Sequence, residues 1–329
     1  MTELALFFGY PLDLIWRAGL RRYEGTGSWG TLLRMRNYSS VTYADVTVPV
    51  PAGGTVTAAL FQPLGAPVAV LVIHSATATP QGFYRALAEH LAEHGIATVT
   101  YDYRGTGRSG DPRAFAGLGV RDWIAQDAPA VAAWAHRRFP DLPHFALGHS
   151  LGGHVIALGE AGDHLTGAVI VASHLAAIRR IPSVMERVRV QLLFSVLGPA
   201  AVRLFGYVPA RRLGLGEDIP SGAFAEWAGW ARRDQYFADD PSMRTAERFI
   251  RVTQPVLAIG FTDDPWSTPE QIDALTARLT GATVERRTYT PADAGVARIG
   301  HHGFLRREVG ESLWPDLVAW LSAYANKEA

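Results

Sequence analysis

The residue that could do chemistry is Ser150, which stands between Gly148 and Gly152 in the pattern G-x-S-x-G within HFALGHSLGGHVIAL at residues 144–158. An apolar run typical of a strand leads into the serine, and a run typical of a helix follows it. At such a junction a sharp turn exposes the serine hydroxyl, and glycines two residues away let the backbone pass close by. The pattern predicts Ser150 as a nucleophile; the alternative is an ordinary turn whose glycines serve close packing.

A serine hydroxyl needs a neighbouring base, and the base needs a carboxylate to orient it. On sheets that carry this turn, the chain order is serine, then an acid, then histidine. Asp263 and Asp264 follow the apolar run QPVLAIGF, and Asp264 is preferred because the proline after it constrains its loop, with Asp263 as the alternate. His301 and His302 precede the last helical stretch, and His301 is preferred because it directly follows a glycine, with His302 as the alternate.

The same chemistry requires two backbone N–H groups to stabilise a developing oxyanion. The amide of Leu151, directly after the serine, is the first candidate. The second candidate comes from the loop after VAVLVIH, where Ala76 is preferred and Ser75 is its competitor.

We expect four further residues to contact a substrate. Ser75 and His149 adjoin the predicted site, and Trp227 and Trp230 lie in an apolar segment that we expect to close over the serine. Mostly apolar pockets with a few polar groups are typical of small-molecule sites, so an apolar acyl or aryl substrate is favoured.

The spacing of apolar residues along the chain predicts the strands and helices that position these residues. Alternating residues at 41–50 and 55–63 favour a hairpin, and continuous apolar runs at 67–74, 96–104, 143–150 and 166–173 are typical of buried strands. Helical patterns separate these runs. Alternation of this kind predicts an α/β fold with a mostly parallel sheet covered on both faces.

The pattern is interrupted after the sixth strand. Residues 174–250 read as a helical cap inserted between core segments 41–173 and 251–329. The first 40 residues form an apolar segment, interrupted by Asp13 and Arg17, which we expect to be a surface helix rather than a signal peptide. Contact with a membrane surface is the less favoured alternative for this segment and for residues 190–208, where Pro199 and Arg203 argue against a membrane span.

Two other patterns carry weaker signals. Gly105, Gly107 and Gly110 match the spacing G-x-G-x-x-G of dinucleotide sites, but no apolar helix begins where that site requires one. His90 and His94 have the spacing of metal ligands, yet an amphipathic helix explains them more simply. We therefore predict no cofactor and no metal.

Composition narrows the classes further. The 31 basic and 31 acidic residues of the 329-residue chain balance to a formal charge of +0, which gives no reason to expect nucleic-acid binding. The chain has no cysteine, so thiolate chemistry is excluded and a cytoplasmic location is expected. Nothing in the sequence indicates an oligomeric state.

Four segments together resemble the α/β-hydrolase superfamily, in particular bacterial predicted α/β hydrolases of the serine-aminopeptidase or lysophospholipase-like group. They are HSATATPQGFYRALAEHLAEHGIATVTYDYRGTGRSG, LGHSLGGH, GFTDDPWSTPEQ and IGHHGFLR. The cap stretches FGYVPARRLGLGEDIP and WAGWARRDQYF are similar to that group as well. One departure is HSATAT, which stands where a His-Gly opening of the oxyanion loop is more usual.

The resemblance implies a serine hydrolase that cleaves an ester or related acyl bond through an acyl-enzyme, with Ser150, Asp264 and His301 as the triad. Two alternatives stay open: an acyltransferase or thioesterase that acts on a carrier-bound acyl group, and a binding or lyase member of the fold.

Overall fold

The computed structural model describes residues 40–328, so the predicted N-terminal segment lies almost entirely outside the described residues. Its main feature is an eight-stranded sheet in the order β1-β2-β4-β3-β5-β6-β9-β10. The strands are β1 (Val41–Pro49), β2 (Thr55–Pro63), β3 (Ala69–His74), β4 (Ile96–Tyr101), β5 (His144–His149), β6 (Gly167–Val171), β9 (Val256–Phe261) and β10 (Val284–Tyr289).

Strand direction follows the predicted pattern. β1 pairs with β2, and β2 with β4, in antiparallel fashion, whereas the other neighbours are parallel. β3, β4, β5, β6 and β9 are buried along their whole length, because helices cover both faces of the sheet. The prediction of an α/β fold with a mostly parallel sheet is confirmed.

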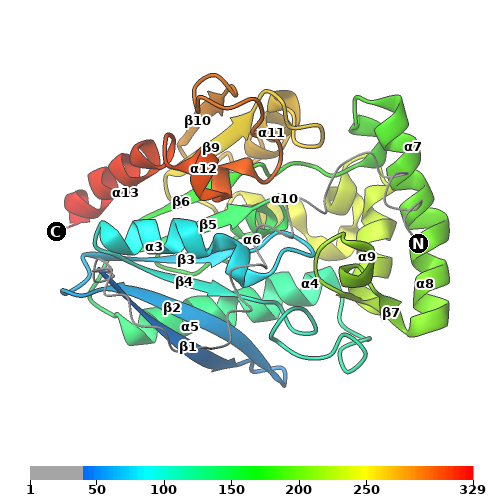
Figure 1. Ribbon diagram of the computed structural model, residues 1–329, viewed down its shortest axis with the longest axis horizontal. Coiled ribbons are helices and arrows are strands. Elements are labelled where there is room, and N and C mark those ends of the chain that lie inside the picture. The colour runs from blue at the N-terminus through cyan, green and yellow to red at the C-terminus, as the bar shows by residue number, and fades with distance from the viewer. Residues whose placement is uncertain (1–39, 329) are drawn as a thin grey trace, which may run out of the picture.

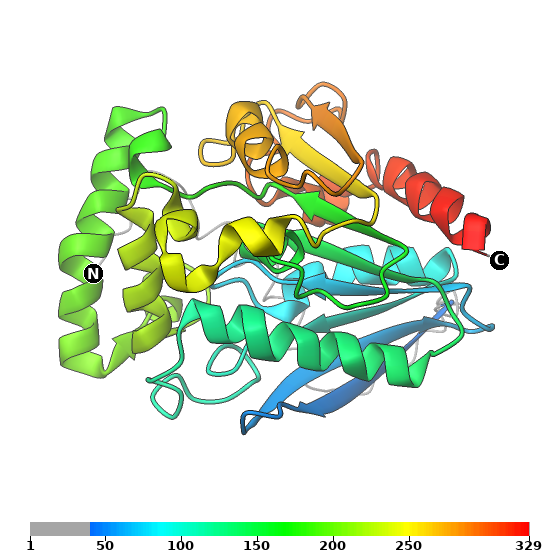
Figure 2. The same cartoon turned by 180° about the vertical axis from the view of Figure 1, so that it is seen from behind.

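Alternate residues of β3 show which helices cover each face. Leu71 and Ile73 belong to one apolar cluster with residues of α3 (Arg85–Glu93), α12 (Arg307–Gly310) and α13 (Trp314–Glu328). Val70 and Val72 belong to another with residues of α4 (Val120–Asp122), α5 (Ala128–Arg138), α6 (Leu151–Ala157) and α11 (Pro269–Thr276). Side chains of a strand point alternately to its two faces, so these helix groups lie on opposite sides of the sheet, as Figures 1 and 2 show.

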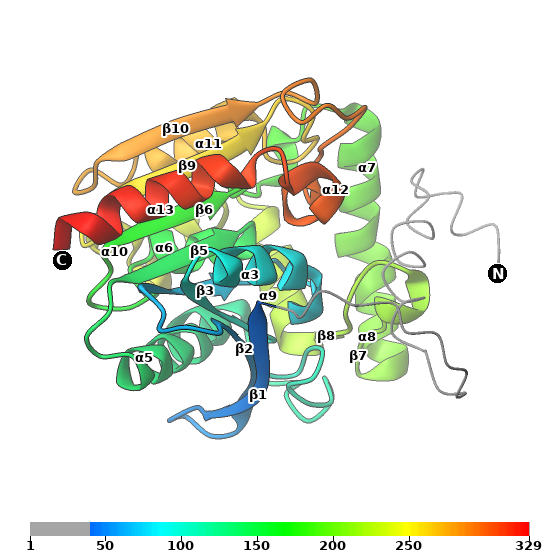
Figure 3. The ribbon, with the colours of Figure 1, turned by 60° about the vertical axis from the view of Figure 1, so that its left-hand side comes forward.

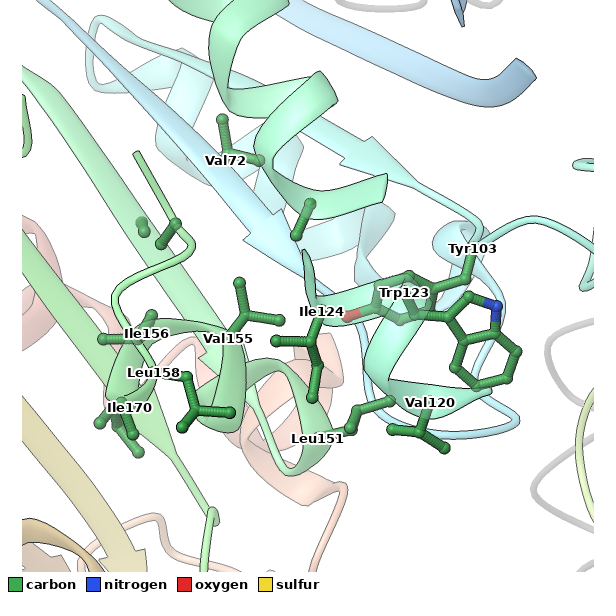
Figure 4. Close-up of a cluster of buried hydrophobic side chains, with 14 of the residues drawn as sticks. Val72, Tyr103, Val120, Trp123, Ile124, Leu151, Val155, Ile156, Leu158 and Ile170 are labelled. Carbon is green, nitrogen blue, oxygen red and sulfur yellow. The ribbon is translucent and has the colours of Figure 1, made fainter. Parts of the chain in front are cut away.

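The start of α6 is packed tightly into the second cluster. In Figure 4, Leu151 and Val155 of α6 lie beside Ile124, which belongs to a π-helical turn over Trp123–Asp127. All three side chains are buried. This contact holds the first turn of α6, and with it the residue just before the helix, in one place on the sheet.

Between β6 and β9 the chain leaves the sheet and forms a mostly helical insertion at one end of the molecule (Figures 1 and 2). We call it the cap, although its closing over Ser150 stays a prediction. Its elements are α7 (Val184–Leu192), α8 (Gly198–Phe205), β7 (Tyr207–Val208), β8 (Ile219–Pro220), α9 (Ser221–Ala231) and α10 (Thr245–Phe249). The antiparallel pair β7 and β8 was not predicted, because two-residue strands are too short to carry a periodic pattern.

The outer side of the cap is one long helix. α7, a π-helical turn over Leu193–Leu197, and α8 run without a break over Val184–Phe205, at the edge of the molecule in Figure 3. Among residues 40–328 this is the one helix whose length and composition would suit a membrane span: an 18-residue window within it has a mean hydropathy of 1.4, and 11% of that window is buried. Pro199 does not end it, because the π-helical turn just before it accommodates the missing N–H.

Candidate active site

Ser150 occupies the turn between β5 and α6 in an uncommon backbone conformation, with φ 51° and ψ −109°. It is partly exposed, whereas every other residue from 144 to 158 is buried. Its own N–H donates to Val171 at 3.0 Å, and the Ser173 hydroxyl donates to its carbonyl at 2.6 Å. The turn is thus anchored to β6 and presents one polar side chain outward.

The flanking glycines leave no room for any side chain. A Cβ on Gly148 would lie 2.2 Å from the Gly152 oxygen, and a Cβ on Gly152 would lie 2.0 Å from the His74 oxygen. Both contacts are with backbone, which cannot rotate away. The predicted steric role of these glycines therefore has a direct cause: the turn, the following helix and the end of β3 meet at backbone contact distance.

Asp264 contacts His301, which lies far from it in the sequence. The Nδ1 of His301 lies 2.7 Å from Oδ2 of Asp264, and both side chains are buried. The other carboxylate oxygen accepts the N–H groups of Trp266 at 2.9 Å and Ser267 at 3.0 Å. A carboxylate at Nδ1 assigns the proton to that nitrogen, which leaves Nε2 of a neutral His301 as an acceptor.

Electrostatics keep Asp264 ionised. Burial alone would raise its pKa, but the imidazole of His301 and the two backbone N–H groups outweigh burial and hold the pKa of Asp264 below its usual range. The carboxylate is therefore charged wherever His301 is able to act as a base.

Asp263 has different partners from its neighbour. Its carboxylate accepts the N–H of Ile299 at 2.9 Å and that of Gly300 at 3.0 Å, while Gly300 takes φ 60°. It thereby braces the loop that carries His301. The alternate His302 packs its ring against Phe83 and His149, and burial lowers its pKa to about 3.

Ser150 and His301 lie at the same edge of the sheet. The ring of His149, the residue before Ser150, is 5.2 Å from the ring of His301, and His149 Nε2 is 2.9 Å from the His301 carbonyl oxygen. No hydrogen bond joins the Ser150 hydroxyl to the His301 imidazole among the described residues. A proton relay requires the serine hydroxyl to turn toward Nε2, and hydrogen bonds of this kind often tighten only with substrate in place.

The two predicted oxyanion donors differ in their surroundings. Leu151 is the first residue of α6, so its N–H has no partner within the helix. The N–H of Ala76 donates to the hydroxyl of Tyr84 at 2.7 Å, so an oxyanion would have to share or replace this partner, and the role of Ala76 as a donor stays a prediction. Ser75, its competitor, is buried with its hydroxyl donating to the Tyr101 carbonyl at 3.1 Å, which takes that side chain away from a substrate.

The remaining predicted substrate contacts pack against other aromatic side chains. Trp230 is 2% exposed, packs on Tyr236 and Phe237, and donates its indole N–H to Asp240 at 2.9 Å. Trp227 packs on Phe194 at a ring distance of 4.7 Å. Trp230 is therefore a packing residue and not the predicted substrate contact, whereas Trp227 is only partly buried and its contact with a substrate stays a prediction. His149 is likewise buried and fully engaged.

The glycine pattern at 105–110 has a structural explanation. A Cβ on Gly107 would meet the Asp102 carboxylate at 2.4 Å, and that carboxylate accepts the N–H of Gln81 at 2.7 Å and of Arg108 at 2.9 Å. The loop wraps around a buried carboxylate, so close packing explains these glycines, and the absence of a dinucleotide site stays a prediction.

Residues 65–259, more than half of the chain, match the model of the family described as serine aminopeptidase, S33. The chain belongs to the serine aminopeptidase S33 family. The match runs from the turn before β3 through the cap to β9, so it includes Ser150 and ends before Asp264.

Curated relatives of this S33 family member include monoglyceride lipases. The rat protein (Rattus norvegicus) is 27% identical over 167 residues, which cover 49% of this chain and 54% of the relative. The human protein (Homo sapiens) is 28% identical over 143 residues, 42% of this chain and 46% of the relative. The chain thus spans about half the length of these curated relatives.

Solved structures resemble the S33 family member in fold. An esterase from Exiguobacterium antarcticum aligns with a TM-score of 0.56 at 17% identity, covering 86% of this chain and 100% of that one. Brefeldin A esterase, a bacterial homologue of human hormone-sensitive lipase, aligns with a TM-score of 0.59 at 17% identity, covering 99% of this chain and 86% of that one. At these identities the likeness establishes the α/β-hydrolase fold.

Sequence reasoning missed several neighbours of His301 in this S33 family member. Trp266 lies 5.1 Å from the His301 ring, and His174 lies 6.2 Å from it. Gln271 donates its Nε2 to two carbonyls, so its oxygen, 3.1 Å from Nδ1 of His174, accepts a proton from that ring. Burial lowers the pKa of His174 to about 4, so it is neutral near pH 7. His174 follows β6 directly, at the sheet edge that holds Ser150, and this position could have indicated from the sequence that it lies near the site.

Proposed function

We propose that this protein hydrolyses carboxylic esters through a triad of Ser150, His301 and Asp264. The observation that carries the proposal is the Asp264–His301 pair, 2.7 Å apart, at the sheet edge where Ser150 alone breaks a buried run. The fold likeness to esterases and the partial likeness to monoglyceride lipases support the same reaction class.

The steps follow from the proton positions. The Ser150 oxygen attacks the ester carbonyl while Nε2 of His301 takes the serine proton, and Asp264 stabilises the resulting imidazolium. The amide of Leu151 donates to the oxyanion of the tetrahedral intermediate. His301 then returns the proton to the departing alcohol oxygen, which leaves an acyl-enzyme. Water, deprotonated by His301, repeats the sequence and releases the carboxylic acid, and none of these steps requires a cofactor.

We assign the substrate as a small ester with an apolar acyl group. The curated relatives are monoglyceride lipases, which supports an acyl chain as the group that binds. The site edge is lined on one side by the rings of Trp266 and His174, neither of which carries charge at neutral pH, and this favours an uncharged substrate.

The decisive variant is Ser150→Ala. Wild-type protein should hydrolyse p-nitrophenyl esters and a monoacylglycerol and should be labelled by a fluorophosphonate, whereas Ser150→Ala should lose labelling and at least about 10³-fold in kcat. Ser195→Ala, on an exposed turn of the cap, is the control and should keep both. Labelling retained in the Ser150→Ala variant contradicts the assignment.

The same assay separates the alternatives. Alanine p-nitroanilide tests the aminopeptidase activity that the family description names, and a competing alcohol tests acyl transfer. Faster turnover of the anilide than of every ester contradicts ester hydrolysis, and an ester of the added alcohol as main product indicates an acyltransferase. A wild-type protein silent toward probe and esters supports a binding or lyase role.

A further inference from the structure

Two buried side chains connect the loops on either side of Ser150. The N–H of Ala76 lies 2.7 Å from the Tyr84 hydroxyl, that hydroxyl lies 3.0 Å from Nδ1 of His149, and Nε2 of His149 lies 2.9 Å from the carbonyl oxygen of His301. Tyr84 and His149 are both 0% exposed. The chain of contacts begins in the loop after β3 and ends in the loop that carries the proposed base.

Only one placement of protons satisfies every contact. The His301 carbonyl accepts, so Nε2 of His149 must carry a hydrogen. Burial holds the pKa of His149 well below its usual value, so the ring is neutral and Nδ1 has none. Tyr84 therefore donates its hydroxyl proton to Nδ1 and receives the N–H of Ala76 on a lone pair. Each polar group in this series of contacts, from Ala76 to His301, then has a partner, which makes the arrangement rigid.

The four groups come from separate segments: the loop after β3, the turn before α3, the last residue of β5, and the loop before α12. The two loops hold the proposed base and one predicted oxyanion donor, and catalysis requires both within a fraction of an ångström of their working positions. His149 precedes Ser150 directly, so these contacts also fix the position of both loops relative to the serine.

We propose that Tyr84 and His149 are positioning residues that hold the oxyanion loop at Ala76 and the base loop at His301 in register on either side of Ser150. Neither touches the reacting atoms. The inference rests on the proposed function, since it concerns the rate of the step that Ser150 begins.

The test combines substitutions that remove one contact at a time. Tyr84→Phe removes the hydroxyl and keeps the ring. His149→Gln is chosen to retain an N–H near the position of Nε2, and His149→Asn to retain an acceptor near the position of Nδ1. The matched control is Tyr236→Phe, because Tyr236 is 1% exposed and lies in the cap, outside both loops.

We expect Tyr84→Phe to lower kcat about 10- to 100-fold with KM changed less than about threefold, and to weaken a boronic acid that mimics the tetrahedral intermediate by the same factor. His149→Gln should retain more kcat than His149→Asn, because the contact to the base loop survives in it. The double variant Tyr84→Phe, His149→Asn should be little worse than the poorer single variant, since both remove one connected unit. Tyr236→Phe should match wild type in kcat and in the boronic-acid constant.

Three results would overturn the proposal: unchanged kcat in Tyr84→Phe, additive losses in the double variant, or losses that follow the melting temperature equally in Tyr236→Phe. A wild-type protein that the fluorophosphonate does not label contradicts the proposed function instead. The two failures are therefore distinguishable in one series.

Discussion

Neighbouring carboxylates in this protein have different tasks. Asp264 contacts the imidazole of His301, whereas Asp263 holds the backbone of Ile299 and Gly300 that carries that imidazole. One residue therefore orients the proposed base directly, and the other fixes the path of its loop. The difference arises because successive side chains at a turn point in different directions.

Substituting each aspartate by asparagine should separate these tasks. Asp264→Asn removes the charge that stabilises the imidazolium and the acceptor that selects its tautomer, so kcat should fall by about 10³ to 10⁴. Asp263→Asn keeps an oxygen able to accept the two backbone N–H groups, so kcat should fall by about tenfold or less. Steady-state kinetics on one p-nitrophenyl ester measure both, and a larger loss in Asp263→Asn would reverse the assignment.

At the scale of elements, the turn between β5 and α6 sets the position of Ser150. It works because β3, β5 and the first turn of α6 touch through backbone atoms at Gly148 and Gly152. Packing of Leu151 and Val155 near Ile124 supports the same helix from its other side (Figure 4). The strained conformation of Ser150 is maintained by these surroundings.

A methyl group should therefore break this junction. Gly148→Ala and Gly152→Ala should each reduce ester hydrolysis more than tenfold or prevent accumulation of soluble protein, because the added carbon would lie near 2 Å from a carbonyl oxygen. Gly229→Ala in α9 meets no atom within 4 Å and should instead raise stability by about 0.5–1 kcal/mol. Thermal unfolding and initial rates on the three variants measure this, and full activity in Gly152→Ala would contradict the close approach.

At the scale of the whole molecule, the cap and one face of the sheet share one apolar interior, because Trp230 and Phe237 belong to the same buried cluster as Val72 of β3. The outer helix over Val184–Phe205 leaves Val188, Val196 and Leu204 exposed. Several histidines are buried as well, among them His74, His154 and His174. Their protonation links the stability of the fold to pH.

The expected direction follows from proton counting. Burial lowers the pKa of His74 and His154 from 6.5 to about 3, and that of His174 to about 4. In the unfolded chain these imidazoles take up protons near pH 6.5, so below that pH the unfolded state binds more protons and stability falls. The loss approaches ~1.4 kcal/mol per pH unit for each histidine between about pH 6 and pH 4.

Thermal unfolding at constant ionic strength from pH 8 to pH 4.5 measures this loss. The melting temperature should be nearly flat above pH 7 and should decline steeply below pH 6.5. His154→Gln should reduce the slope by about one proton. A melting temperature that stays flat down to pH 5 would contradict the burial of neutral histidines.

Features that depend on short stretches of chain were predictable from the sequence. The turn at Ser150 could be predicted because the glycines that it requires lie within five consecutive residues. The sheet could be predicted because strands buried on both faces consist of continuous apolar runs. The preference for Asp264 over Asp263 rested on one following proline, and the structure places Asp264 against His301.

Other features were decided only when distant segments met. The sequence alone shows Tyr84 only as an aromatic residue near the start of a predicted helix. Only the packing of the folded chain brings its hydroxyl between Ala76 and His149. Likewise, the sequence shows Trp230 only as an apolar residue of the predicted cap, and only the fold decides that it is buried against Tyr236 and Phe237. A local pattern determines which residue types stand near one another along the chain, whereas hydrogen-bond partners depend on distances across the sheet, and those exist only in the folded molecule.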